Sequence, residues 1–523
     1  MEKLKNIIIS QVPRVLSLLD REKTSQTYGC FDRTYWNYRE RDMPNALCQE
    51  AVLFLALVYK NNFPGNIYFN NRKIYEWILA AMNFWKKIQN ENGSFNEVYK
   101  NEYSFASTVF TTYAITESLL ILNHFPKEIL NSIKKAGQWT IKNSDPGRIS
   151  NHEAGAVAAL HNIYKITGEA KYENAAKKFL SNLKQSAEGW FDEYGGADIG
   201  YQSWSIDYLA KYYNSSKNKD ALGKLESAVE FISYFMHPDG SAGGEYGSRG
   251  MQFLFPHGFT LVSKQIPLAS SILKNFLQKL KQTPETVDDR YFIVLLTNYL
   301  QTYLNMPSVF DSTKLPCQKN IKKYFSEANL FVISNDFYYA IFSGKGTVSI
   351  YSKISPLVFT DCGFIGKIGN KLLTSNWLDK KYDVEFTENQ ISITGKLHEF
   401  KQIFFSPSTL MLFKLFTLTL GKVENISIYL KKKMINRIIT KSKTIPVKFQ
   451  RKISLNKSIR IEDTLEGNVN FDSLLLGGKF SLPYVTFSKY FLPSDLESST
   501  TDLTKKFNST GKIKIIRTID MKK

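Results

Sequence analysis

The 523-residue sequence predicts an α+β fold of several domains, an N-terminal (α/α) toroid of helical hairpins followed by a C-terminal antiparallel β-sandwich. The toroid is predicted by a loop type that recurs about every fifty residues between segments of helical length, since stacked helical hairpins repeat at such intervals. The sandwich is predicted because apolar residues recur at spacings of three and four up to about residue 310 and alternate with polar residues after it.

The recurring loop begins with a glycine and carries an acidic residue, accompanied in three of its four copies by an aromatic one. It occurs at residues 29–33, 93–97, 189–193 and 240–245, and segment 145–152 takes the missing place in the series. If the hairpins close into a ring, all five loops lie at one end and line one cleft. Aromatic rings beside carboxylates suit a surface that holds sugar rings.

Helical periodicity predicts an amphipathic helix in residues 1–25 and then five pairs. The pairs are 44–61 and 70–90, 104–124 and 127–143, 152–167 and 171–186, 200–213 and 219–237, and 257–281 and 284–304. Residues 1–308 are assigned to the toroid, 309–325 to a linker and 326–523 to the β domain. Alternation predicts strands at 328–344, 346–353, 390–400, 411–421, 457–467 and 512–520. Whether the ring is complete stays open.

The formal net charge of +20 favours a polyanionic partner, although solubility alone also explains it. A basic insertion near 425–461 holds eleven Lys and Arg and no acid. It is either an amphipathic helix on an anionic membrane or polyanion, or a solvated segment between strands, and the second interpretation is favoured because charge runs are commonly solvated. Nucleic acid is not an expected partner.

Four widely spaced cysteines argue against a zinc knuckle and against a disulfide-rich scaffold. The N-terminal apolar run is too short for a signal peptide, and no stretch has the length of a membrane span. A cytoplasmic protein is expected, with peripheral membrane contact as an option. No cofactor is expected.

Three helix starts carry candidate catalytic residues. Asn151 and His152 open one predicted helix, where backbone N–H groups favour a substrate carboxylate. The alternative is that Asn151 only caps the helix and His152 is a surface residue. Tyr201 opens the helix one repeat later and can act as base and acid if nearby cations lower its pKa, or it is a rim aromatic. His257 opens the next helix, as a fourth candidate or as a cap.

Further residues are candidates for substrate binding. Arg33, Trp36, Tyr38 and Arg41 suit a carboxylated sugar, or they form a network that holds the N-terminal helix. Trp190 and Trp204 are candidates for stacking on sugar rings. Glu97, Glu193 and Glu245 occupy corresponding places in three loops, where they could serve a glycoside hydrolase, cap helices or pair with Arg148 and Arg249.

A toroid followed by an antiparallel β domain, with Asn151-His152 at one helix start and Gly200-Tyr201 about fifty residues on, resembles the heparinase II/III-like polysaccharide lyases and their alginate-lyase relatives. The resemblance implies that Asn151 neutralises a uronate carboxylate, that His152 or Tyr201 abstracts the C5 proton, and that Tyr201 protonates the departing O4. It also implies a His/Asp metal cluster in the β domain. Because His398 is the only histidine there, no metal is expected.

The expected function is β-elimination on an anionic, uronate-containing polysaccharide, and the expected partner is such a polysaccharide or a lipid-linked glycan. A uronate C5-epimerase and a non-catalytic glycan-binding protein of surface polysaccharide biosynthesis are the alternatives, and a glycoside hydrolase is the less favoured one.

Overall fold

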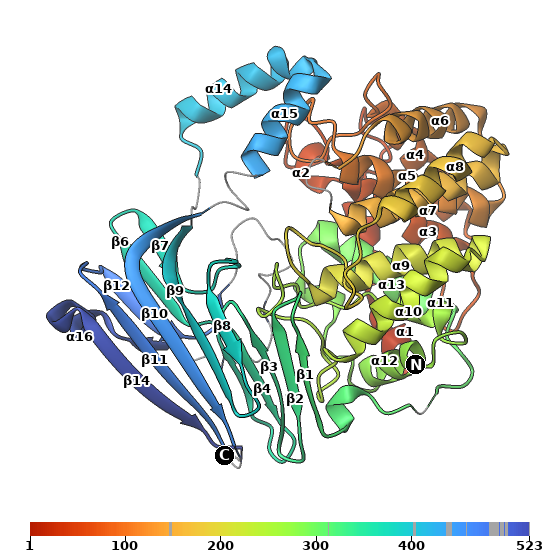
Figure 1. Ribbon diagram of the computed structural model, residues 1–523. Helices are drawn as coiled ribbons and strands as arrows, with labels where there is room; N and C mark the ends of the chain where they lie inside the picture. Colours follow the sequence, from red (N-terminus) through yellow and green to blue (C-terminus); the bar gives the residue numbers. More distant parts are fainter. Residues whose placement is uncertain are drawn as a thin grey trace.

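The computed structural model describes residues 1–145, 149–311, 313–400, 404–435, 442–456, 458–480, 491, 496 and 500–521. A helical part and a part built of β-sheets lie side by side, and a pair of helices from the second reaches over the first (Figure 1). The predicted fold class, a helical toroid followed by antiparallel sheets, is confirmed.

Six inner helices among the described residues form the ring. They are α3 (Ala51–Lys60), α5 (Phe105–Leu122), α7 (Ser150–Thr167), α9 (Ile199–Ser216), α11 (His257–Val262) and α13 (Asp289–Leu304). Each contacts the next and α13 contacts α3, so the ring is closed. Within the described residues only α5 is long and apolar enough to cross a membrane, and 83% of it is buried inside the protein, as expected for a core helix that is apolar all round.

Outer helices cover the ring, each with one apolar face. They are α1 (Glu2–Leu18), α4 (Arg72–Lys87), α6 (Lys127–Lys142), α8 (Ala170–Asn182), α10 (Lys219–Ser233) and α12 (Pro267–Lys279). Short helices α2 (Arg33–Trp36), η1 (Ala46–Glu50) and η2 (Pro284–Thr286) lie in the connections. The predicted helix 257–281 is two helices, because Pro267 takes the first position of α12 and cannot continue α11.

The glycine that opens each recurring loop has a steric cause. Gly93 and Gly189 have φ of 98° and 95°, a region that favours glycine. A Cβ at Gly93 would lie 2.4 Å from the Lys135 carbonyl oxygen, and one at Gly189 would lie 2.2 Å from that of Ser227. Both carbonyls belong to the following outer helix. The repeat therefore marks the places where a loop passes directly over an outer helix.

Two sheets form the second part. After η3 (Pro316–Gln318), the first has the order β1 (Ile321–Phe325), β2 (Leu330–Ser334), β3 (Tyr338–Ser343), β4 (Val348–Ser352) and β5 (Val358–Asp361). The second sheet has the order β13 (Thr500–Asp502), β12 (Ser473–Gly477), β6 (Phe364–Ile368), β7 (Lys371–Thr374), β9 (Gln390–Phe400), β10 (Lys443–Leu455), β11 (Ile459–Gly467) and β14 (Lys512–Ile519). β8 (Asp383–Phe386) pairs with β9, and α16 (Thr504–Thr510) precedes β14. One apolar core joins the sheets, with Phe342 on the first and Phe449 on the second.

The prediction of a strand at 411–421 is wrong. The segment lies in α14 (Pro407–Leu418) and η4 (Leu420–Lys422), and α15 (Glu424–Ile435) follows. The hydroxyl of Ser406 accepts the Thr409 N–H and Pro407 takes the first helical position, which together start a helix. Residues 436–441 and 457 of the basic insertion lie outside the described residues. Its remainder divides between α15 and strands β10 and β11, so the insertion is not simply a solvated segment.

The β part holds the loop end of the toroid from two sides. Between β3 and β4, Lys345 Nζ donates to the carbonyl of Gly247 at 2.6 Å, within the loop that precedes α11. On α15, Lys431 Nζ lies 2.7 Å from Glu102 Oε1, in the loop that precedes α5. The connections that precede α5 and α11 are therefore held by contacts from the β part. The domain boundaries predicted at 308 and 326 stay a prediction; α13 ends at Leu304 and β1 begins at Ile321.

Candidate active site

Asn151 places a buried side-chain amide at the start of α7. It is the second residue of α7 and 1% exposed, and neither Oδ1 nor Nδ2 has a hydrogen-bond partner among the described residues. The cap position belongs to Ile149, so the interpretation of Asn151 as a helix cap is wrong. An unpaired buried amide is costly, and the first turn of a helix favours an anion. The site is therefore suited to a ligand that accepts hydrogen bonds, such as a carboxylate.

His152 is paired with a carboxylate. Its Nδ1 lies 2.7 Å from Asp145 Oδ2, and its ring packs edge-on against Phe110 at 5.4 Å. A neutral imidazole that donates from Nδ1 has a free lone pair on Nε2. The pair therefore has the arrangement of a general base held by a carboxylate. Residues 146–148 of this loop lie outside the described residues.

Tyr201 is a neutral phenol. It is the third residue of α9, and its backbone N–H is capped by Asp198 Oδ1 at 3.2 Å. Burial raises the pKa of Tyr201 well above its ordinary value, Tyr291 and Glu193 raise it further, and Arg249 opposes them. The lowered pKa expected from the sequence is wrong for this state of the protein. A protonated phenol at this place is suited to donate a proton.

The three corresponding glutamates differ in their electrostatic surroundings. Burial raises the pKa of Glu193 well above its ordinary value and Asp198 adds to the effect, and Glu193 Oε1 has no partner in the described part of the chain. Burial would also raise the pKa of Glu97, but Arg290 and Lys431 outweigh it and lower the pKa. The carboxylate of Glu97 lies 2.6 Å from Arg290 Nη2. Two residues named here, Arg290 and Lys431, were not candidates in the sequence.

The third glutamate has a structural contact. Glu245 Oε1 accepts a hydrogen bond from Gln252 Nε2 at 2.9 Å, and both side chains are buried. The guanidinium of Arg249 lies 4.5 Å above the ring of Tyr194. Its charge still acts on Glu193 and Tyr201. We therefore place Arg249 beside the candidate catalytic residues.

The cations near Glu97 come from distant parts of the chain. Arg290 is the second residue of α13, and Lys431 projects from α15 of the β part. Burial would lower the pKa of Lys431, but Glu102 and Glu97 outweigh it and raise the pKa, so the amine is charged. Arg290 lies at the start of a helix, like Asn151 and Tyr201. Its position at a helix start is the sequence signal that could have identified it. Lys431 has no such signal, because its position depends on how the two parts pack.

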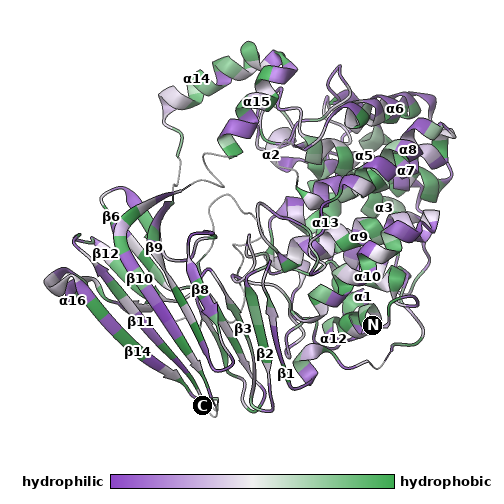
Figure 2. Cartoon of the chain, in the orientation of Figure 1, coloured by the Kyte–Doolittle hydropathy of each residue, from purple (hydrophilic) through white to green (hydrophobic). Residues whose placement is uncertain are grey.

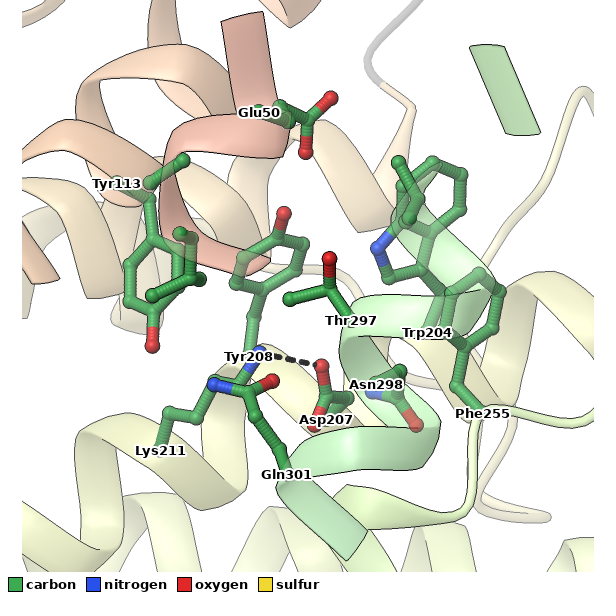
Figure 3. A pocket seen from close by; sticks show the side chains of 13 residues that line it. Glu50, Tyr113, Trp204, Asp207, Tyr208, Lys211, Phe255, Thr297, Asn298 and Gln301 are labelled. Carbon is green, nitrogen blue, oxygen red and sulfur yellow. Dashed lines mark hydrogen bonds and ion pairs between the residues drawn. The ribbon is translucent and has the colours of Figure 1, made fainter. Parts of the chain in front are cut away.

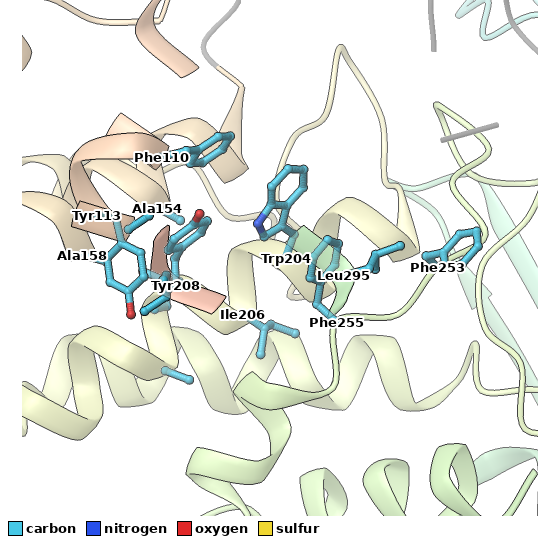
Figure 4. Close-up of a cluster of buried hydrophobic side chains, with 14 of the residues drawn as sticks. Phe110, Tyr113, Ala154, Ala158, Trp204, Ile206, Tyr208, Phe253, Phe255 and Leu295 are labelled. Carbon is cyan, nitrogen blue, oxygen red and sulfur yellow. The ribbon is translucent and has the colours of Figure 1, made fainter. Parts of the chain in front are cut away.

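Trp204 lies beneath the site rather than on it. It is 5% exposed and stacks between Phe110 at 5.0 Å and Phe255 at 4.8 Å, with Tyr208 also stacked on Phe110 (Figure 4). Both candidate catalytic rings contact this aromatic layer. The ring of Tyr201 contacts Trp204, and the ring of His152 contacts Phe110. Trp204 therefore supports the site and has no open face for a sugar ring.

Below the aromatic layer the axis of the toroid is polar. A cavity of about 20 Å³ is lined by Glu50, Trp204, Asp207, Tyr208 and Lys211, among others (Figure 3). Burial raises the pKa of Glu50 to about 8. Lys211 Nζ pairs with Asp207 Oδ2 at 2.7 Å. These ionisable groups lie inside the toroid, with Glu50 at the start of α3.

His257 is not grouped with Tyr201. Its Nδ1 lies 3.0 Å from Asp207 Oδ1, and its ring lines a cavity of about 430 Å³ together with Asn305, beside the last residue of α13. Burial lowers the pKa of His257, although Asp207 opposes the effect. Asp207 is six residues after Tyr201 on α9, about 9 Å along the helix. The structure thus places His257 toward the opposite end of the ring, hydrogen-bonded to Asp207.

Trp190 and the N-terminal cluster have structural contacts. Trp190 is 9% exposed and its Nε1 donates to Glu188, whose carboxylate also accepts the backbone N–H of Ala328 between β1 and β2. Trp190 therefore lies at the junction with the β part.

In the cluster, Trp36 Nε1 donates to the carbonyl of Leu18 at 2.8 Å, Arg33 lies 5.6 Å from the ring of Tyr38, and Arg41 lies 3.7 Å from Asp32. These contacts join α2 to the end of α1, as in the interpretation of a network that holds the N-terminal helix.

No group of three or more His, Cys, Asp or Glu side chains in the described ranges could hold a metal ion. In the β part, His398 Nε2 lies 3.0 Å from Asp379 Oδ2.

Comparisons with known proteins agree with this architecture. Residues 48–255, which include α7 and α9 with Asn151, His152 and Tyr201, match the family model described as the ulvan lyase N-terminal domain. The resemblance to the toroidal polysaccharide lyases is confirmed. Comparison with curated protein sequences finds no match.

Among solved structures, a Paenibacillus xanthan lyase is similar at a TM-score of 0.52 and 10% identity, covering 90% of this chain and 46% of that one. The chain thus spans just under half the length of the xanthan lyase, and at this identity the likeness concerns the fold. The Streptomyces coelicolor A3 chondroitin AC lyase has a TM-score of 0.49 at 8% identity, covering 91% of this chain and 71% of that one. A heparan sulfate lyase mutant from Pedobacter heparinus has a TM-score of 0.42 at 11% identity, and the match covers 90% of this chain and 70% of that one.

Proposed function

We propose that this protein cleaves an anionic, uronate-containing polysaccharide by β-elimination. The observation that carries the proposal is the amide of Asn151, which has no hydrogen-bond partner among the described residues and is buried at the start of α7 next to the His152–Asp145 pair. A lyase needs a group that binds the uronate carboxylate, a base for the C5 proton and an acid for O4. Asn151, His152 and Tyr201 offer these three chemistries, and the match to a lyase domain over residues 48–255 supports the assignment.

The carboxylate is the group that makes C5 acidic. When the C5 proton leaves, negative charge spreads onto the carboxylate oxygens, so donors that strengthen as this charge grows lower the barrier. Asn151 Nδ2 and the backbone N–H groups of the first turn of α7 are such donors. Arg249, Arg290 and Lys431 add positive charge around the site and attract a polyanionic chain.

Two residues move the protons. His152 Nε2 takes the C5 proton, and the electron pair of the C5–H bond forms the C4=C5 double bond. The C4–O4 bond breaks, and Tyr201 gives its phenolic proton to O4. The products are a chain end with a free hydroxyl and an unsaturated uronate on the other fragment. The raised pKa of Tyr201 keeps the proton on the phenol until O4 departs.

A panel of uronate polysaccharides tests the proposal. The C4=C5 double bond conjugated with the carboxylate absorbs ultraviolet light, so absorbance reports elimination directly. Tyr201→Phe should lower kcat by roughly 10²- to 10⁴-fold, the range for loss of one acid–base group, with KM little changed. Tyr324→Phe is the matched control, because Tyr324 is 40% exposed on β1 of the first sheet. Wild-type turnover in Tyr201→Phe would exclude Tyr201 as the acid.

The same experiment separates the other activities. Deuterium uptake from heavy water at C5 without a rise in absorbance would indicate epimerisation. New reducing ends without a double bond would indicate hydrolysis. Either result would refute β-elimination. A lipid-linked glycan substrate and a cytoplasmic location stay proposals; cell fractionation tests the location.

A further inference from the structure

Helix α14 exposes large apolar side chains that nothing in the described structure covers. Met411 and Leu415 are 69% and 59% exposed, and Leu418 lies one turn further at 45%. Their spacing of four and three residues aligns them along one side of the helix. Leu412 and Leu420 extend this surface. We call these five residues the α14 face. Figure 2 shows the apolar colouring of α14.

The other side of α14 is anchored. Phe413 packs edge-on against Tyr99 at 5.0 Å, and Asn101 Nδ2 donates to the Thr417 carbonyl at 2.8 Å. Lys414 pairs with Asp42 at 2.6 Å. One side of the helix thus contacts the helical part, and the opposite, exposed side is also apolar. Helices that are apolar all round are normally buried, and a contiguous exposed apolar patch marks an interaction site.

The helical pair α14–α15 carries exposed lysines and a single acidic residue. Lys422 is exposed on η4, two residues after Leu420 of the α14 face, and Lys432 and Lys433 are exposed in the last turn of α15. The acidic residue, Glu424, accepts a hydrogen bond from the indole N–H of Trp139 at 2.6 Å. An apolar face on a helical pair with exposed lysines is complementary to an anionic lipid surface, where apolar side chains enter the acyl boundary and lysines meet the headgroups.

We propose that the α14 face docks onto an anionic lipid bilayer. The twelve residues of α14 extend about 18 Å and are too short to span it, so the helix lies in the plane of the interface. A second copy of the chain is the competing occupant, but a symmetric pairing would bring the lysines of both copies together. Docking would bring the rim of the candidate site, the loop at residues 97–103, close to the membrane. The inference does not rest on the proposed β-elimination.

Vesicle flotation tests the proposal with the full chain. We expect binding to vesicles of phosphatidylcholine with phosphatidylglycerol, and weaker binding to phosphatidylcholine alone or at high salt. The double variant Met411→Glu and Leu415→Glu should bind at least about tenfold more weakly, because two apolar side chains no longer enter the lipid. Ile67→Glu is the matched control, since Ile67 is 78% exposed on the helical part, and it should bind like the wild type.

Three results would overturn the proposal. One is no binding to anionic vesicles, and another is equal binding by the double variant. The third is a wild-type dimer in solution that the double variant abolishes, which would assign the face to a second copy. Circular dichroism checks that the variants fold, and turnover of a soluble polysaccharide should be unchanged in them, so failure of docking and failure of the lyase proposal remain distinguishable.

Discussion

Glu50 should make the stability of the toroid fall as pH rises, and the substitution Glu50→Gln should remove this dependence. The carboxyl is buried at the start of α3, and burial raises its pKa from 4.5 to about 8, although Arg290 and Lys211 oppose the effect. In the unfolded chain the same group titrates near its ordinary value. Between these two pKa values the folded protein holds a proton that the unfolded chain has lost, so stability falls as pH rises through this window.

Glu50→Gln keeps the shape of the neutral acid and does not titrate. The difference in unfolding free energy between variant and wild type therefore isolates the contribution of Glu50. With pKa values of 4.5 unfolded and about 8 folded, the advantage of the variant should grow by about 3 kcal/mol between pH 6 and pH 9.

Urea titrations at both pH values measure this difference. The surface variant Glu226→Gln on α10 is the control, and its difference from the wild type should stay constant. An advantage of Glu50→Gln that does not change with pH, or that shrinks as pH rises, would refute the assignment of a neutral carboxyl inside the toroid.

Two further substitutions test the packing. Gly189→Ala should lower the melting temperature by several degrees, because φ is 95° and the new Cβ would meet the Ser227 carbonyl, whereas Gly223→Ala, in open space on α10, should be neutral or stabilising. Arg451→Met should destabilise the β part by about 3–5 kcal/mol in urea titrations, since Asp361 and Asp463 lose a buried partner, while Arg460→Met on the exposed side of β11 should change little. Equal effects in either pair would contradict the contacts described above.

The elements that could be predicted from the sequence are those in which local pattern and tertiary packing agree. On α4, Ile74, Ile78, Ala81 and Trp85 recur at three and four residues and form its buried side. The recurring loops could also be recognised from their glycines, because any other residue would be strained at these positions.

The strand predicted at 411–421 fails because α14 is apolar on two sides. A helix that is apolar on one side only shows a period of 3.6, whereas an apolar run without this period cannot be told from a strand. Its exposed face, which would identify an interaction surface, is invisible until the fold is known.

The candidate site was predicted in part. Asn151, His152 and Tyr201 lie at helix starts and were found for that reason, as the loop repeat indicates which helix ends face one another. Trp204 and His257 were assigned to the cleft because position in the sequence does not show how far along the ring axis a side chain lies. Lys431 was missed because it reaches the site from a segment more than two hundred residues distant from Tyr201 in the chain.

The ultraviolet absorbance of uronate polysaccharides incubated with the wild-type protein and with Asn151→Ala tests the central claim most directly. Elimination by Asn151, His152 and Tyr201 predicts that absorbance rises on at least one uronate polysaccharide with the wild type and at a rate at least about a hundredfold lower with the variant, because the donor to the developing charge is lost. A rise of equal rate with Asn151→Ala, or no rise on any uronate polysaccharide, would contradict the account.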